Sequence, residues 1–237
     1  MKSALSATLT ALAIATPIAT PAAAQTPATD SAPAPVVVIV RVPKPWYAPK
    51  ALVASKMRDT IAEYDKLPGL KYKIYTLAQA DGRYGGVYLW QDRASAEAWF
   101  NPAWFARVEK ERGAAGEVRY FTATQVKDYR PGGTPANTHS DSVVTVITLP
   151  AAAGADLTQS NIQLRALLPA RYPALLREYG LASADGRFGL ALLWQDQAAA
   201  EQWITSDWLA GLRKTFGAEP VAEWYDAPIL TPSTLQR

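Results

Sequence analysis

The chain has 237 residues, of which 49% are hydrophobic and 19% are charged, and its 24 basic and 21 acidic side chains leave a formal net charge of +3. These are the proportions of an ordinary globular protein, which excludes a chain that is disordered throughout. Because no block of Lys and Arg is present, we do not expect a nucleic-acid partner. The absence of cysteine excludes disulfides and thiolate chemistry, and the single histidine, His139, excludes a multi-histidine metal site.

The N-terminal segment predicts export. Lys2 precedes an apolar run over residues 4–18, and three alanines end at Ala24, just before Gln25. A positive start, a short apolar stretch and a small-residue cleavage site are typical of a secretory signal peptide, so we expect residues 1–24 to be removed and the protein to be periplasmic or secreted. An Ala-rich leader without an export role is the alternative. The apolar run is too short to span a bilayer, so no membrane partner is expected.

The elements expected next are those of a first module over residues 36–126. Residues 25–35 are rich in Pro, Ala, Ser and Thr, which predicts a disordered linker. The module's predicted elements are a strand at 36–42, a helix at 49–66, strands at 72–79 and 83–91 joined at Asp81-Gly82, a helical region after Asp92 that is interrupted near Asn101-Pro102, and a strand at 117–126.

The second half of the chain repeats the first. When the sequence is shifted by 104 positions, 16 of the 31 residues from 80 to 110 are identical. A Pro- and Gly-rich linker at 127–142 separates the copies, and a tail at 231–237 follows them. The second module, 143–230, is predicted to contain strands at 143–149, 175–182, 187–195 and 221–226 and helices at 157–168 and 197–216.

The order of these elements predicts the fold. A β-α-β-β-α-β series is ferredoxin-like, with two helices on one face of a four-stranded antiparallel sheet. The strand at 84–91 carries apolar side chains on both faces, so the face without helices needs a cover. We therefore predict an α+β fold, in which two tandem ferredoxin-like modules pack sheet to sheet as an intramolecular pseudo-dimeric α+β barrel. A monomer is the expected oligomeric state.

Three segments of the first module resemble a known family. The runs GLKYKIY at 69–75, GGVYLW at 85–90 and AEAWF at 96–100 are similar to those of the YdhR-type monooxygenases, which belong to the dimeric α+β barrel superfamily. The resemblance covers both modules and is closer in the first, because Gly86 and Tyr88 become Leu190 and Leu192 in the second. It implies the barrel fold and an oxygenase-type activity. Single-module relatives dimerise, so this chain resembles such a dimer fused into one polypeptide.

The candidate site residues are those that we expect to line a cavity inside the barrel. They are Tyr75, Tyr88, Trp90, Arg119, Tyr179, Trp194 and Glu223. Arg41 and Lys73 are further polar candidates. Tyr75 and Tyr179 match under the 104-residue shift, which favours a shared structural hydrogen bond over catalysis. Arg119 and Glu223 also match, and positions related by a pseudo-twofold axis can meet near it, so we predict an ion pair. The matched tryptophans either fill the core or stack on a planar substrate.

Two functions remain open. His139 falls in the linker rather than in a predicted strand or helix, which argues against histidine-ligated haem and leaves no expected cofactor. The first function is a secreted, cofactor-independent monooxygenase-like activity on an aromatic or quinol-like small molecule. The alternative is a non-catalytic periplasmic small-molecule-binding or structural module, and a protein-interaction role through the outer faces is a third, weaker option. A barrel cavity with convergent polar groups would favour catalysis. Packing of the barrel by Tyr84, Phe188, Leu190 and Leu192 would favour the structural role.

Overall fold

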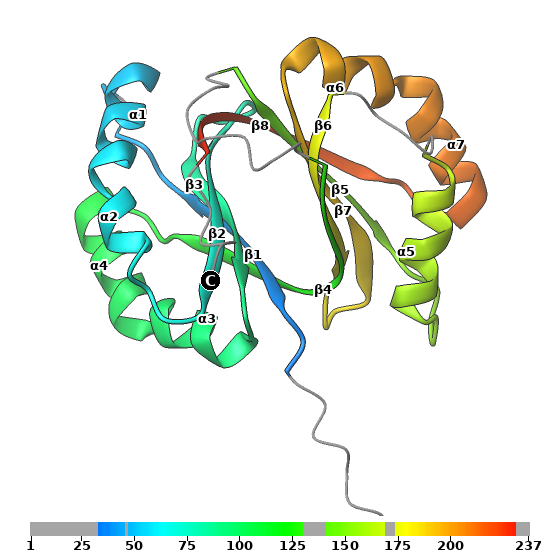
Figure 1. The fold of residues 1–237 in the computed structure, drawn as a ribbon, viewed down its shortest axis with the longest axis horizontal. Helices are drawn as coiled ribbons and strands as arrows, with labels where there is room; N and C mark the ends of the chain where they lie inside the picture. The colour runs from blue at the N-terminus through cyan, green and yellow to red at the C-terminus, as the bar shows by residue number, and fades with distance from the viewer. Residues whose placement is uncertain (1–32, 46, 130–140, 169–173, 231–237) are drawn as a thin grey trace, which may run out of the picture. The chain divides into compact units, whose positions relative to one another are not determined.

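Eight antiparallel strands close into one barrel in the part of the chain that the computed structural model describes, residues 33–45, 47–129, 141–168 and 174–230. The strand order is β1-β3-β2-β8-β5-β7-β6-β4, and helices lie on the outside at two opposite sides (Figure 1). The predicted signal peptide, most of both linkers, the C-terminal tail, Trp46 and His139 lie outside the described residues. The α+β class and the antiparallel barrel are as predicted.

The elements of the first half are β1 (Val36–Val42), α1 (Lys50–Asp59), α2 (Ile61–Tyr64), β2 (Leu70–Ala78), β3 (Tyr84–Trp90), α3 (Arg93–Trp99), α4 (Pro102–Arg112) and β4 (Glu117–Asp128). Those of the second half are β5 (Val143–Pro150), α5 (Leu157–Ala166), β6 (Leu175–Ala182), β7 (Arg187–Trp194), α6 (Gln197–Trp203), α7 (Ser206–Phe216) and β8 (Val221–Leu230). The predicted strands and helices are all present, and most differences lie at their ends. Two predicted helices are divided: Thr60 separates α1 from α2, and Ile204 and Thr205 separate α6 from α7, where one helix was expected over 197–216.

Local sequence explains where the second helical region of each half begins. The carboxylate of Asp92 accepts a hydrogen bond from the backbone N–H of Ser95 at 2.7 Å, and that of Asp196 accepts one from Ala199 at 2.8 Å. These are the predicted N-caps, which satisfy backbone donors that the first helical turn leaves free. Asn101 caps α4 in the same way, so the interruption predicted at Asn101-Pro102 is where α3 ends and α4 begins.

The last strand of each half is longer than predicted because it pairs with the other half. β4 continues to Asp128, whose partner in β6 is Arg177, and β8 continues to Leu230, whose partner in β2 is Ile74. Within each half the strand orders are β4-β1-β3-β2 and β8-β5-β7-β6, and these two pairings close the barrel. Pairing between segments so distant in sequence leaves no local signal.

The two faces of the sheet bury different clusters. One cluster contains side chains from all eight strands and none from a helix, including Val37, Ile74 and Tyr179, so it fills the barrel interior. On the outer face, strand side chains pack against helices in separate clusters, such as Val38 and Trp90 with Trp104 of α4. Alternation along each strand therefore divides its residues between the barrel interior and the helix-covered face.

The strand registers show which residues of the two halves occupy corresponding positions. Tyr72 pairs with Leu89, and Arg177 pairs with Leu193, so β2 and β6 correspond with an offset of 105 residues. The offset is 104 in β3 and β7, where Leu89 matches Leu193. The hairpin between β6 and β7 is thus one residue shorter than the hairpin between β2 and β3. Because a one-residue offset in a strand exchanges its two faces, this difference decides which side chains are equivalent.

Candidate functional site

A pocket of about 430 Å³ lies in the first half, between the outer face of the sheet and helices α1, α2, α3 and α4. Its lining includes six aromatic side chains from strands and helices, namely Tyr64, Tyr75, Tyr84, Tyr88, Trp99 and Trp104. Its volume lies within the roughly 300–1,000 Å³ typical of small-molecule sites, and its walls combine apolar surface with a few polar groups, as such sites usually do.

This position corrects the expected cavity inside the barrel. The interior is occupied by the apolar cluster to which all eight strands contribute. Phe188, Leu190 and Leu192, which were considered as fillers of the barrel, instead pack on the helix-covered face of the second half, and Tyr84 packs on that of the first. Strand alternation alone showed two apolar faces but did not show which one the helices cover.

At the floor of the pocket lies Lys73, which is 4% exposed. Its Nζ lies 3.0 Å from the ring centroid of Tyr64, 3.8 Å from that of Tyr75 and 4.8 Å from that of Tyr88. Lys73 and Tyr88 are register partners on β2 and β3, and Tyr75 follows two residues later on the same face. Tyr64 is the last residue of α2. The sheet register and the helix end together surround one amine with three rings.

Burial determines the protonation of this group. Desolvation lowers the pKa of the Lys73 ammonium well below that of a lysine in water, and the carboxylate of Glu63 opposes this only in part. The same desolvation raises the pKa values of Tyr64, Tyr75 and Tyr88, so their hydroxyls stay protonated at neutral pH. The pocket therefore combines an amine that is easily deprotonated with phenols that remain hydrogen-bond donors.

The rings form a connected frame. Tyr64 packs edge-on against Tyr75, with centroids 6.0 Å apart, and against Trp99 at 5.7 Å. Tyr88 packs edge-on against Phe100 at 5.4 Å. The Tyr75 hydroxyl lies 2.9 Å from Oγ1 of Thr60, where the helix breaks. Such edge-to-face contacts fix ring orientation, so the walls are largely pre-formed.

Charged side chains from the helices also line the pocket. They are Lys56, Glu63, Arg107, Glu111 and Arg112. The Arg112 guanidinium lies over the Tyr84 ring, 5.6 Å from its centroid. Since Lys56, Arg107 and Glu111 are exposed, these groups mark the side of the pocket that faces solvent.

The corresponding place in the second half has the opposite chemistry. Glu178 pairs with Leu192, as Lys73 pairs with Tyr88, so an acid replaces the amine and leucine replaces the tyrosine. The Glu178 carboxylate is 0% exposed, forms an ion pair with Arg165 at 2.9 Å and accepts hydrogen bonds from Gln125 and Tyr129, both at 2.8 Å. Glu178 and Arg165 line a space of only about 160 Å³. In the second half, the ion pair of Glu178 and Arg165 thus occupies the position that belongs to the larger pocket in the first half.

Residues 40–126 match the family model described as putative mono-oxygenase ydhR. This match confirms the resemblance to the YdhR-type family, and every residue that lines the 430 Å³ pocket falls within the matched span. A search of the curated proteins gave no match.

Solved structures of low sequence identity share the fold. A protein from Fusobacterium nucleatum described as a putative monooxygenase is 10% identical, with 85% of this chain and 96% of that protein covered and a TM-score of 0.62. One from Lactobacillus acidophilus with the same description is 10% identical, covering 84% and 96%, with a TM-score of 0.57. A protein described as anthrone oxidase-like is 11% identical, covering 85% and 92%, with a TM-score of 0.50. At these identities the likeness extends to the fold alone.

Two of the seven candidate residues, Tyr75 and Tyr88, line the pocket of the YdhR-matched half. The matching of Tyr75 with Tyr179 was wrong, because the 105-residue offset places Gly180 opposite Leu190 as Tyr75 lies opposite Gly86. Tyr179 instead faces the barrel interior. Its hydroxyl accepts a hydrogen bond from Arg177 at 3.2 Å, and burial raises its pKa to about 12.

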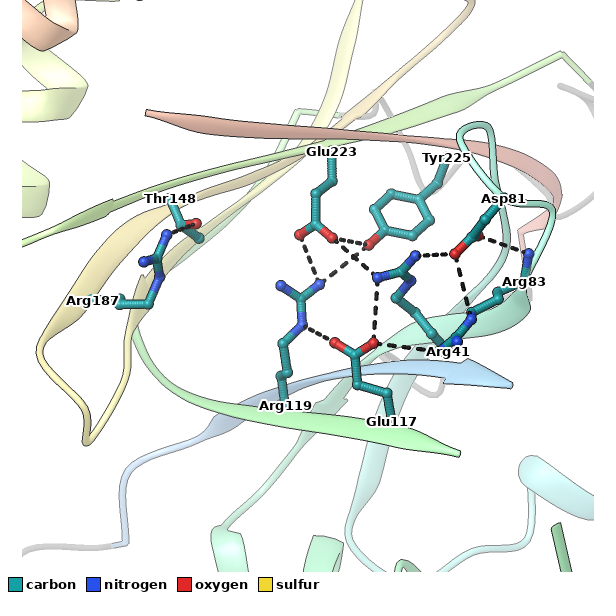
Figure 2. Close-up of polar contacts among 9 residues, drawn as sticks. All are labelled: Arg41, Asp81, Arg83, Glu117, Arg119, Thr148, Arg187, Glu223 and Tyr225. Carbon is teal, nitrogen blue, oxygen red and sulfur yellow. Dashed lines mark hydrogen bonds and ion pairs between the residues drawn. The ribbon is translucent and has the colours of Figure 1, made fainter. Parts of the chain in front are cut away.

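Arg119 and Glu223 form the predicted ion pair, with Arg119 donating to Glu223 at 2.7 Å. Figure 2 shows them within a network that also includes Arg41, Asp81, Arg83, Glu117 and Tyr225. Arg119 and Glu223 come from β4 and β8, which lie opposite each other in the strand order, so their contact bridges the barrel. Three cations balance three anions here, which indicates a structural role rather than a substrate clamp.

Trp90 and Trp194 also lie away from the pocket lining, in the helix-facing clusters of the two halves. Trp194 donates through Nε1 to Oγ1 of Thr145 at 2.9 Å. The buried Nε1 of Trp90 has no hydrogen-bond partner among the described residues. Both tryptophans are therefore core residues, as one of the two interpretations held.

The seven candidate site residues did not include Tyr64 or Trp99. Lys73 was named only as a further polar candidate. Lys71 and Lys73 both stand between apolar residues of this strand, so the sequence alone did not distinguish the buried lysine from the exposed one. Within the described ranges, no group of three or more His, Cys, Asp or Glu side chains is placed to hold a metal ion. None of the described helices has the length and apolar character needed to cross a membrane.

Proposed function

We propose that the protein is a cofactor-independent, monooxygenase-like enzyme that acts on an aromatic, quinol-like small molecule in the pocket of its first half. The observation that carries this proposal is the buried amine of Lys73 among Tyr64, Tyr75 and Tyr88. The family match over residues 40–126 and the shared fold of monooxygenase-described proteins support the reaction class.

The geometry suits proton abstraction followed by reaction with oxygen. An aromatic compound with an acidic CH₂ or hydroxyl group would lose a proton to the unprotonated form of the Lys73 amine, which burial favours, and the resulting ammonium would stabilise the substrate anion beside it. Hydroxyls of the surrounding tyrosines would donate to the substrate oxygen. The electron-rich anion then reduces O₂. For a reacting CH₂ group, one oxygen atom becomes the carbonyl oxygen of the product and the other leaves as water with the two hydrogens. The substrate supplies all the electrons.

Anthrone tests this proposal, because it has an acidic CH₂ between aromatic rings and one protein of the same fold is described as anthrone oxidase-like. We expect the protein to accelerate oxygen uptake, measured with an electrode, and anthraquinone formation above the rate in buffer. Lys73→Met should lower the rate by about 10²–10⁴-fold, the usual contribution of a general base. Lys71→Met, which changes an exposed lysine on the same strand, should not. Equal rates for wild type and Lys73→Met would contradict the proposal.

The non-catalytic alternative is favoured by the second half, where Leu192 and Glu178 replace Tyr88 and Lys73. It predicts that anthrone binds, quenching tryptophan fluorescence, without oxygen uptake beyond that in buffer. Saturable binding with no product would therefore favour a binding module over an enzyme.

We also propose that residues 36–126 and 143–230 are tandem modules that make the barrel as an internal pseudo-dimer. Support comes from the matching strand orders of the two halves and from the pairings that close the barrel. Such a chain has no need of a second copy, so native mass spectrometry should show a monomer, and a stable homodimer would contradict the proposal.

We also propose that the protein is exported to the periplasm or secreted by means of an N-terminal signal peptide. The lysine, apolar run and alanines at the N-terminus support it. We expect N-terminal sequencing of protein from the periplasmic fraction to begin at Gln25. An intact N-terminus in protein from the cytoplasm would contradict this.

A further inference from the structure

The amine of Lys73 has a second chemical capacity that proton abstraction does not use. The unprotonated form of a primary amine is a nucleophile, and burial in an apolar site, which favours that form, is one of the ways in which proteins activate lysine. Lys73 is 4% exposed and forms part of the lining of an open pocket. A ligand that enters the pocket can therefore reach a side chain that is otherwise withdrawn from water.

We propose that Lys73 forms a reversible Schiff base with an aromatic aldehyde or ketone bound in this pocket. The proposal rests on the ligand site of the proposed function but not on oxygenation. The aromatic class follows from the walls, where the rings of Tyr64, Tyr84, Tyr88 and Trp99 offer an aromatic ligand stacking and edge-to-face contacts.

The reaction is balanced without an external reagent. The Nζ lone pair attacks the carbonyl carbon and the C–N bond forms, giving a carbinolamine. The C–O bond then breaks, and the oxygen leaves as water with one proton from the amine and one from a donor, which regains its proton from the remaining N–H as the neutral imine forms. The hydroxyls of Tyr64, Tyr75 and Tyr88 stay protonated at neutral pH because burial raises their pKa values, so they suit the donor role. No electrons are exchanged with an oxidant or reductant.

The second half provides an internal contrast. Glu178 stands where Lys73 stands in the first half, and its carboxylate is already bonded to Arg165, Gln125 and Tyr129. We therefore expect one modified lysine per chain. Lys71 offers a second contrast, because it lies two residues from Lys73 on β2 but is exposed to solvent.

The test is reductive trapping of the full protein with 2-naphthaldehyde and sodium borohydride at pH 7. Reduction fixes an imine as a secondary amine, which adds the mass of the aldehyde less one oxygen atom. Peptide mapping with fragmentation then assigns the label. We expect Lys73 to carry at least about tenfold more label than Lys71, since each unit by which a lysine pKa is lower raises its neutral fraction about tenfold. Naphthalene-2-methanol, which lacks the carbonyl, should lower labelling at Lys73 and leave Lys71 unchanged.

Label spread evenly over exposed lysines, or present on Lys71 and absent from Lys73, would overturn the proposal. This mapping uses the wild-type protein, so it does not depend on whether a Lys73 variant folds. Lys73→Met, which is neutral and has no amine, should remove the pocket-specific label. Trapping at Lys73 without anthrone oxidation would refute the oxygenase proposal alone, and anthrone oxidation without trapping would refute the Schiff base alone.

Discussion

Replacing Arg165 by methionine tests whether the second half is a structural counterpart of the pocket-bearing half. The guanidinium lies 2.9 Å from the Glu178 carboxylate, and the two side chains are 17% and 0% exposed. Methionine keeps much of the side-chain volume but removes the charge. Glu178 would then retain only its hydrogen bonds from Gln125 and Tyr129.

The expected cost is large because the carboxylate is 0% exposed and its charge would be left without a cationic partner. Removing one partner of a buried ion pair typically costs about 3–5 kcal/mol, whereas replacing both partners with apolar side chains is often close to neutral. For a protein of this size each kcal/mol shifts the melting temperature by about 2–4 °C, so we expect Arg165→Met to melt roughly 6–20 °C below wild type. The double variant Arg165→Met/Glu178→Leu should recover more than half of that loss.

Thermal unfolding followed by circular dichroism, together with urea titration at 25 °C, would measure both variants. Labelling of Lys73 by naphthaldehyde below the melting temperature serves as the functional control, and it should be the same in the double variant and in wild type. A loss below about 1 kcal/mol for Arg165→Met, the range of exposed ion pairs, would refute the reasoning. A double variant as unstable as the single variant would show that the charges are not the cause.

Four further outcomes follow from the same contacts. Thr145→Val should cost roughly 1–2 kcal/mol in urea titration, because it leaves the buried Nε1 of Trp194 without its acceptor; wild-type stability would contradict this. Lys73→Met should stabilise the protein by about 1 kcal/mol at pH 7, as replacements of functional groups often do. This difference in the free energy of unfolding between Lys73→Met and wild type should shrink toward pH 10, where the unfolded lysine also loses its proton. A difference that grows with pH would be contrary evidence. For Tyr179, the native pKa of about 12 lies above the unfolded value of about 10, so stability should fall as pH rises through that interval, and less steeply in Tyr179→Phe. Arg119→Met should cost about 1 kcal/mol at low salt and less at high salt, and a loss that does not depend on salt would exclude an electrostatic origin.

Most of the fold could be predicted because its signals are local. The β-branched run of β1, the cap at Asp92 and the turn at Asp81-Gly82 each act within a few residues. The ends of β4 and β8 could not be predicted, because their final residues are strands only through partners in the other half. Non-local pairing is the part of β-structure that local sequence specifies least.

The candidate site was predicted less well, for two physical reasons. The first is the one-residue difference between the two hairpins, which makes Tyr75 correspond to Gly180 and not to Tyr179. The second is that both faces of each strand are apolar, one against the barrel interior and one against helices. Tyr88 was expected to face a cavity inside the barrel, but it lies on the helix-covered face of the same strand. Tyr64 was missed because its position in the pocket depends on where α2 ends.

Comparison of the two halves distinguishes residues that the fold requires from residues of the candidate site. Gly85 and Gly189 match under the 104-residue shift because a Cβ at either would lie 2.0 Å from a backbone oxygen of the neighbouring strand. Asp92 and Asp196 match because both cap helices. These shared residues meet backbone requirements that are present in both halves of the barrel. Lys73 meets none of them, since the same backbone position holds a glutamate in the second half and the barrel still closes. A buried amine that the fold does not require, in the half that has the larger pocket, supports the proposal that this pocket binds a ligand.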